Sequence, residues 1–254
     1  MLHSRTDLKP LHLRARDGDI RHVEDAYFDD RDWLLRYIVV DTGGWLSGRK
    51  VLIAPAAIRR VEWDREEIVV DLTREQVENS PHIDADKPIS RQQEATYFDY
   101  YGYSYYWSDA FVSAGVNTIP PEVIEQARIQ QEEELAHADP NLRSLAEVTG
   151  YRIEAADGDI GHIDDFLFDD ETWMLRYLVV DTRDWLPGRR VVVAPDWVER
   201  VSWTERKVFV DLSKGAVNDS PEYRDPTSLT AEQEAAIYRH FGRASSAEPF
   251  APNA

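Results

Sequence analysis

The sequence predicts a mainly β protein with added helices, arranged as two tandem small closed β-barrels joined by an aromatic and helical connector. Two observations lead to this fold class. Segment 2–102 recurs as segment 142–242 without a gap, and about 40 of about 101 aligned positions are identical, which indicates internal duplication. Within each copy, short β-rich runs alternate with turn residues about every ten residues, a spacing typical of small barrels and sandwiches.

The domain boundaries follow from the repeat. A duplicated sequence of this length is expected to repeat its own core, so each copy should be one folded unit. The predicted domains are a first repeat with a C-terminal helix at 2–102, the connector at 103–141, a second repeat with a C-terminal helix at 142–242, and a disordered tail at 243–254.

Six strands are predicted in each copy. Asp17-Gly18 and Asp157-Gly158 predict a tight hairpin between the first two strands, because Gly tolerates positive φ. Six strands closed on themselves leave no exposed sheet edge. The predicted strands are 11–16, 20–28, 33–41, 50–54, 58–63 and 68–72, and in the second copy 151–156, 160–168, 173–181, 190–194, 198–203 and 208–212.

Two helices follow the strands of each copy. Thr73 and Gln76 have the spacing of a capping box, which predicts a short helix after Thr73, whereas the second copy keeps only Ser213. A second helix is predicted at 90–102 and at 230–242, where each capping sequence is followed by a closing Gly. In the connector, a helix is predicted from Pro121 to about His137.

The composition is that of a folded chain without thiol chemistry. Of the 254 residues, 43% are hydrophobic and 30% are charged, which is typical of globular proteins. The absence of cysteine excludes disulfides, zinc–thiolate sites and thiol nucleophiles. Because there is no apolar run of membrane-spanning length and no signal peptide, we expect a cytoplasmic protein with no direct membrane insertion.

The net charge of −19 narrows the range of partners. Binding to a phosphate backbone depends on Lys and Arg, so a strongly acidic chain is expected to bind no nucleic acid. We expect either a protein partner, whose identity the sequence does not give, or a second copy of the chain in a homo-oligomer. The sequence contains no nucleophile elbow, P-loop, zinc-protease motif or dinucleotide fingerprint, so we expect no enzyme activity and no cofactor.

His22 and His162 are the histidines that recur in both copies. Histidine is a proton carrier and a common metal ligand. The alternative is a structural histidine hydrogen-bonded to a nearby carboxylate such as Glu24 or Asp164. We favour the structural interpretation, because one histidine per repeat without a second beside it is a poor ligand set.

Carboxylates are dense around the predicted hairpins and could be interpreted as a Ca²⁺ or Mg²⁺ site. The alternating ligands, glycine and closing Glu of a helix–loop–helix calcium site are missing, so two hairpin turns explain the same residues. No catalytic, cofactor-binding or metal-binding residue is therefore assigned. The carboxylates are Asp17, Asp19, Glu24, Asp25, Asp29 and Asp30, and in the second copy Asp157, Asp159, Asp164, Asp165, Asp169 and Asp170.

Arg36 and Arg176 each interrupt an otherwise apolar predicted strand. They could bind anions, but a buried guanidinium needs a partner to offset its desolvation. The alternatives are a position at the barrel rim and an internal ion pair. The expected carboxylate partners are Asp41 or Asp71 for Arg36, and Asp181 or Asp211 for Arg176.

The aromatic segment from Tyr97 to Phe111 is the main feature that the two copies do not share. Aromatic residues are enriched at interface hot spots, which suggests a partner or pigment surface. The alternative is that they pack the connector between the barrels or across a homodimer. The aromatic residues after Tyr97 and Phe98 are Tyr100, Tyr101, Tyr103, Tyr105, Tyr106, Trp107 and Phe111.

Both copies resemble the PRC-barrel family, over about 70 residues each. The resemblance is carried by Asp-Gly-Asp-Ile-Gly-His-Ile-Asp-Asp-Phe-Leu-Phe-Asp-Asp-Glu-Thr-Trp at 157–173, Arg-Tyr-Leu-Val-Val-Asp-Thr at 176–182, Trp-Leu-Pro-Gly-Arg-Arg at 185–190 and Val-Val-Ala-Pro at 192–195. The family takes its name from the cytoplasmic domain of the H subunit of the purple bacterial photosynthetic reaction centre. The resemblance implies a small closed β-barrel that binds protein partners and is not catalytic.

Three functions remain open on this basis. The first is a non-catalytic tandem PRC-barrel protein that acts as a protein–protein interaction or assembly module. The second is an H-subunit-like accessory of a photosynthetic reaction-centre or electron-transfer complex. The third is a small-molecule or metal-binding sensor.

Overall fold

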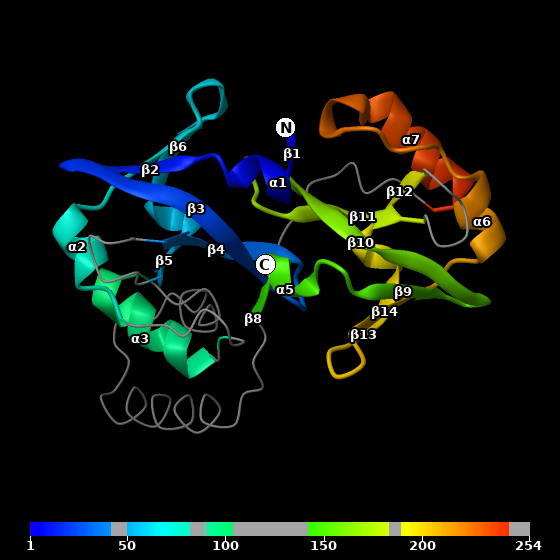
Figure 1. Cartoon of the computed structure of the whole chain (residues 1–254), viewed down its shortest axis with the longest axis horizontal. Helices are drawn as coiled ribbons and strands as arrows, with labels where there is room; N and C mark the ends of the chain where they lie inside the picture. The colour runs from blue at the N-terminus through cyan, green and yellow to red at the C-terminus, as the bar shows by residue number, and fades with distance from the viewer. Residues whose placement is uncertain (42–49, 82–88, 90, 104–141, 183–188, 244–254) are drawn as a thin grey trace, which may run out of the picture. The chain divides into compact units, whose positions relative to one another are not determined.

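The protein is mainly β, with two mixed seven-stranded sheets and a few helices (Figure 1). The computed structural model describes residues 1–41, 50–81, 89, 91–103, 142–182 and 189–243. The chain forms two compact units, which we describe separately. Unit 1 comprises Met1–Lys9, Trp33–Leu35 and Leu145–Ala254, and unit 2 comprises Pro10–Asp32 and Arg36–Ser144.

The sheet of unit 2 has the strand order β5-β4-β3-β2-β7-β6, with β8 paired to β3. Strands β2 and β7 are parallel, which makes the sheet mixed. Its strands are β2 (His12–Ala15), β3 (Gly18–Asp29), β4 (Leu34–Asp41), β5 (Lys50–Ile53), β6 (Ile58–Glu62), β7 (Glu67–Val70) and β8 (Leu142–Ser144).

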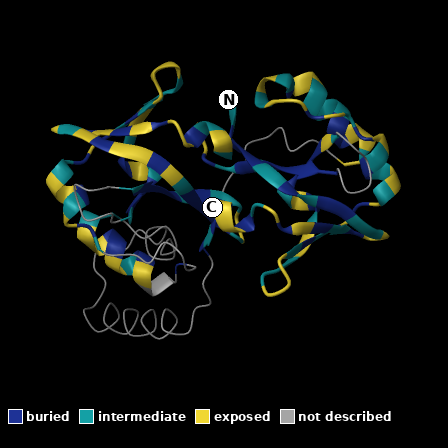
Figure 2. Ribbon diagram, in the orientation of Figure 1, coloured by how far each residue is buried: buried dark blue, intermediate teal, exposed yellow. Residues whose placement is uncertain are grey.

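The sheet of unit 1 repeats this order as β12-β11-β10-β9-β14-β13, with β1 paired to β10. Strand β11 is mostly buried, whereas the loop between β13 and β14 is exposed (Figure 2). Its strands are β1 (Leu2–Ser4), β9 (Arg152–Ala155), β10 (Gly158–Asp169), β11 (Leu175–Asp181), β12 (Arg190–Val193), β13 (Val198–Ser202) and β14 (Lys207–Val210). The prediction of two similar β halves is confirmed.

Short helices complete both units. The α-helices are α1 (Arg5–Leu8), α2 (Arg74–Glu78), α3 (Arg91–Tyr101), α5 (Leu145–Val148), α6 (Lys214–Asp219) and α7 (Ala231–His240). The 3₁₀ helices are η2 (Pro55–Ala57), η3 (Trp63–Arg65), η5 (Pro195–Trp197) and η6 (Pro226–Ser228).

Each sheet contains a strand from the other repeat. Strand β1 precedes the other strands of the first repeat, yet it pairs with β10, with His3 opposite Phe168. Strand β8 has the equivalent position in the second repeat, yet it pairs with β3, with Arg143 opposite Phe28. The sequence analysis predicts neither this exchange nor strands β1 and β8 themselves.

In both units, the aspartate of the predicted Asp-Gly turn also accepts a hydrogen bond from the start of a helix. The backbone N–H of Arg74, the first residue of α2, donates to Asp17 Oδ1 at 2.8 Å. The backbone N–H of Lys214, the first residue of α6, donates to Asp157 Oδ1 at 2.7 Å. Each aspartate therefore ties the tip of its hairpin to the start of a helix, where backbone N–H groups have no partner within the helix.

The predicted helix starts are also observed. Thr73 and Gln76 form the reciprocal capping box of α2, and Ser213 accepts from the N–H of Ala216 at 3.1 Å. Thr230 caps α7. Several predicted features lie outside the described residues, namely Ser90, the connector beyond Tyr103 with its helix from Pro121, and the tail 244–254.

Candidate functional site

The recurrent histidines lie in a row of side chains that runs across the strands of each unit. Register partners on neighbouring strands place their side chains on the same face of a sheet. In unit 2, His22 on β3 is opposite His12 on β2, and His12 is in register with Glu67 on β7. The row therefore brings two histidines and one carboxylate together on one face.

The His12 and His22 rings face each other across the hairpin. Their centroids are 3.7 Å apart and the rings are inclined by 45°, and both residues are exposed. The expected carboxylate Glu24 forms an ion pair with Lys50, with 2.9 Å between Nζ and Oε1. Recurrence between the copies does not reveal His12, because the second copy has Arg152 at this position.

Unit 1 brings together His162, Asp164 and Asp181 at the equivalent place. One ligand atom from each lies within 4.8 Å of the others, the one such group of three found in the described part of the chain. His162 is the register partner of Asp181, and a β-bulge falls at Asp164. Asp181 is 2% exposed, and its backbone oxygen would lie 2.0 Å from a Cβ on Gly161, where φ is +126°.

Arg190 contacts this group in unit 1, and two more cationic residues continue its row across the sheet. Arg190 Nη2 lies 3.0 Å from Asp164 Oδ2, and the register partners that continue the row past His162 are Arg152 and then Lys207. A metal cation would have to compete with Arg190 for Asp164. His162 and Asp164 lie close to each other, and the arrangement fits an internal ion network better than a metal centre.

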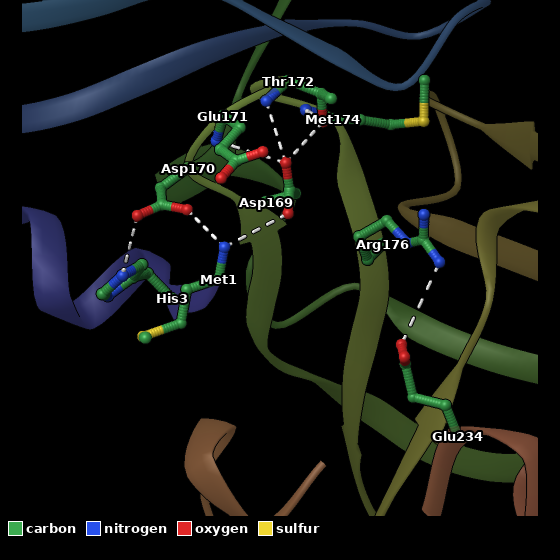
Figure 3. Close-up of polar contacts among 9 residues, drawn as sticks. All are labelled: Met1, His3, Asp169, Asp170, Glu171, Thr172, Met174, Arg176 and Glu234. Atoms are coloured by element: carbon green, nitrogen blue, oxygen red, sulfur yellow. Dashed lines mark hydrogen bonds and ion pairs between the residues drawn. The ribbon is translucent and has the colours of Figure 1, made fainter. Parts of the chain in front are cut away.

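Turn and ion-pair contacts occupy several of the hairpin carboxylates (Figure 3). Asp169 Oδ1 accepts from Thr172 Oγ1 and from the Thr172 N–H, both at 2.9 Å. Burial alone would raise the pKa of Asp169, but these hydrogen bonds hold it below its usual value. The Met1 amine also lies between Asp169 and Asp170.

His3 lies beside the same turn, next to Asp170. Its Nε2 lies 3.3 Å from Asp170 Oδ2 (Figure 3). Burial lowers the pKa of His3, and the charge of Asp170 opposes that shift in part. The equivalent pair in unit 2 joins Arg143 Nε to Asp30 Oδ2 at 3.4 Å.

The carboxylates predicted to pair with Arg36 and Arg176 were wrong. Arg36 pairs with Asp32 at 3.0 Å and lies 3.9 Å from Asp29. Arg176 Nη2 lies 4.0 Å from Glu234 Oε1 on α7 (Figure 3). The physical reason is distance along the strand, because Asp41 and Asp181 are five positions further along, and at about 3.3 Å per residue that is about 16 Å.

The described part of the aromatic segment packs onto unit 2. Tyr97 is 1% exposed, donates from its hydroxyl to the Leu52 carbonyl at 2.7 Å, and meets the Tyr37 ring edge-on at 5.2 Å. Tyr101 and Tyr103 pack against the same cluster and stack on each other. Burial raises the pKa of Tyr97 well above its usual value. These residues therefore belong to the core of unit 2, while Tyr105, Tyr106, Trp107 and Phe111 lie outside the described residues.

Each unit also has a tyrosine–carboxylate pair that the sequence analysis missed. Tyr37 donates to Glu94 Oε1 at 3.1 Å, and Glu94 is 1% exposed. Tyr177 donates to Glu234 Oε1 at 2.8 Å. The two pairs occupy equivalent positions of the two repeats, and this recurrence in the sequence could have indicated them.

The chain is a duplicated, mainly β protein. Polar residues at equivalent positions of the two repeats make contacts within their own unit. No protein-family model and no curated protein matches the chain. Among the described residues, no helix is both long enough and apolar enough to cross a membrane.

Proposed function

We propose that the chain is a non-catalytic tandem PRC-barrel protein that acts as a protein–protein interaction or assembly module. The resemblance at 157–173 and the identical strand order of the two sheets support this proposal. A barrel that recurs twice in one chain presents the same type of surface twice, which suits an assembly role.

Closure of each sheet into a barrel is part of this proposal. The first and last strands of the order in unit 1, β12 and β13, are consecutive in the chain and are joined only through Ala194 and η5. The equivalent strands of unit 2, β5 and β6, are joined only through Ala54 and η2. So short a link keeps the two outer strands close at one end, and closure would remove their free edges.

The observation that carries the interaction function is strand addition. Strand β10 accepts β1, and β3 accepts β8, so each sheet binds an extended segment that its own repeat does not supply. Adding a strand to a sheet edge is a common way to recognise a peptide, because main-chain hydrogen bonds give affinity and side-chain pockets give specificity. Strand β1 forms only three register pairs, so it is a modest competitor for a longer segment.

We therefore propose that a partner protein docks an extended segment on the β10 edge in place of β1. The net charge of −19 favours a partner with a basic surface, since complementary charge accelerates association. The proposed function includes no catalytic step.

Purification of the tagged full chain from its native host, followed by mass spectrometry, tests this function. The sharpest variant is Thr6→Cys with Asp165→Cys, because these side chains meet where the β1–α1 segment contacts β10 and the chain has no other cysteine. We expect the wild type and the reduced variant to recover the same partner, and the oxidised variant, with β1 locked in place, to lose it.

The outcomes separate two claims. Equal recovery by the oxidised variant would show that the partner binds elsewhere than the β10 edge. Repeated recovery of the wild-type chain alone and monomeric would reject the interaction function.

The second candidate is an H-subunit-like accessory of a photosynthetic or electron-transfer complex, which the resemblance at 157–173 favours. Cell fractionation of the native host tests it. We expect co-fractionation with the membrane complex, and recovery only in the soluble fraction of a host without reaction centres would reject it.

A further inference from the structure

We propose that His12 and His22 bind a divalent transition-metal ion, such as Zn²⁺, Ni²⁺ or Cu²⁺, on the exposed face of the β2–β3 hairpin in unit 2. This site is independent of the proposed interaction function. It rests on the facing imidazole rings and on the charge of the residues in their row.

The hairpin holds the two imidazoles side by side. Register partners on antiparallel strands have Cα atoms about 4.5–5.5 Å apart, and the ring centroids of His12 and His22 are 3.7 Å apart. Metal–nitrogen bonds are about 2.0–2.1 Å long, so two nitrogens on one ion lie about 3 Å apart. Because both side chains are exposed, rotation about their χ angles would separate the rings and turn one nitrogen of each toward a shared ion.

The hairpin that carries the two rings is formed before any ion binds, with a register irregularity between His12 and Arg14. Ala15 and Gly18 are register partners at the end of the hairpin, so only two residues turn the chain. The Asp17 carboxylate anchors this turn to α2. A chelate on a preformed hairpin loses little conformational entropy on binding, which favours affinity.

The charge of the row suits a cation in unit 2 and not in unit 1. Beside His12 lies Glu67, which is also 3.3 Å from Arg14 Nη1. The second repeat replaces His12 with Arg152 and Glu67 with Lys207, and Arg152 pairs with Asp159 at 2.7 Å. The duplication thus supplies an internal comparison in which the same hairpin carries a fixed positive charge in place of the second imidazole.

A pair of imidazoles favours the divalent transition metals that bind nitrogen ligands most tightly. Neutral imidazole nitrogen suits Zn²⁺, Ni²⁺ and Cu²⁺, whereas Mg²⁺ and Ca²⁺ prefer oxygen ligands. With two protein ligands, water would complete the coordination. The expected order of affinity is Cu²⁺ above Ni²⁺ and Zn²⁺, with no measurable effect of Mg²⁺.

Isothermal titration of the untagged, chelator-treated full chain with CuCl₂, NiCl₂ and ZnCl₂ tests the site. We expect a Zn²⁺ site that depends on His12 and a rise in melting temperature with added metal. His12→Arg copies the residue of the second repeat at an exposed position. It should weaken binding by more than about 100-fold, since even indirect partners of a metal are worth about 10- to 100-fold.

His162→Asn is the matched control and should leave the titration unchanged. Absence of binding to the wild type, or unchanged binding by His12→Arg, would overturn the proposal. So would loss of binding in His162→Asn with retention in His12→Arg, because the ion would then bind in unit 1. Thermal melts of both variants without metal verify that each chain is folded.

Discussion

Thr6 donates a hydrogen bond from Oγ1 to Asp165 Oδ2 at 2.8 Å, although 159 positions separate the two residues. The reciprocal contact joins the Ser144 hydroxyl to Asp25 in unit 2. Asp25 and Asp165 are equivalent positions of the two repeats. Each long strand thus receives a hydroxyl group from the other repeat at the same aspartate.

A cysteine pair distinguishes exchanged strands from strands that stay in their own repeat. In the exchanged arrangement, Thr6→Cys with Asp165→Cys should form an intrachain disulfide under mild oxidation. Thr6→Cys with Asp25→Cys should not, because Asp25 is the residue that Thr6 would meet without exchange. Non-reducing electrophoresis and peptide mapping measure both yields, and the opposite result would contradict the exchange of β1.

Gly161→Ala should destabilise unit 1 by about 1–3 kcal/mol, the usual cost of overpacking a well-packed site. The new Cβ would lie 2.0 Å from the backbone oxygen of Asp181, at a φ of +126°. Gly215→Ala is the control, because the nearest heavy atom to its Cβ is Ser213 Oγ at 4.0 Å. It should raise stability by about 0.4–1 kcal/mol, as measured by urea titration followed through amide signals of unit 1.

The stability of unit 1 should fall as the pH drops from 7 through about 6.5 and below. Burial lowers the pKa of His3 from its ordinary 6.5, so in this window the unfolded chain binds a proton that the folded chain does not. Protonation therefore favours unfolding. Urea midpoints of unit 1 signals between pH 5 and pH 7.5 measure the slope.

His3→Arg is the matched variant for this slope. It places at position 3 the residue of the second repeat, where Arg143 pairs with Asp30, and a guanidinium does not titrate in this range. The variant should lose the part of the pH dependence that His3 contributes. An unchanged slope would assign the effect to another group.

Tyr37→Phe should destabilise unit 2 by about 1–3 kcal/mol, because it removes a hydroxyl donor from the buried carboxylate of Glu94. Tyr177→Phe is the matched change in unit 1, where the Glu234 side chain is 24% exposed and water can replace the lost donor. The loss should therefore be smaller. Hydrogen exchange of sheet amides in each unit compares the two variants, and equal losses would contradict a role for burial.

The strands were predictable because their signals are local. The run of β-branched and aromatic residues before Asp41, and the Asp-Gly turn at Asp17, fix strand and hairpin without reference to the rest of the chain. Observed β4 (Leu34–Asp41) differs from the predicted 33–41 by one residue, since Trp33 adopts a positive φ of 54° at the turn. Capping residues such as Thr73 carried equally local information.

The exchange of strands was not predictable from either repeat. Residues 2–4 read Leu-His-Ser and residues 142–144 read Leu-Arg-Ser, so each segment fits either acceptor edge in pattern and size. The choice is decided by tertiary contacts, which a local pattern does not contain. The His12–His22 pair was missed for a related reason, because register across a hairpin, and not recurrence along the chain, brings the rings together.

The exchange of β1 and β8 also decides where the gene can be divided. A fragment that ends at Gly102 would contain β3 without the β8 that pairs with it, and a β1 whose acceptor β10 is missing. A fragment that begins at Leu142 would have the complementary defect. Mixed together, the two fragments again hold every strand of both sheets, so a split reporter built at this junction should regain its fold only by complementation.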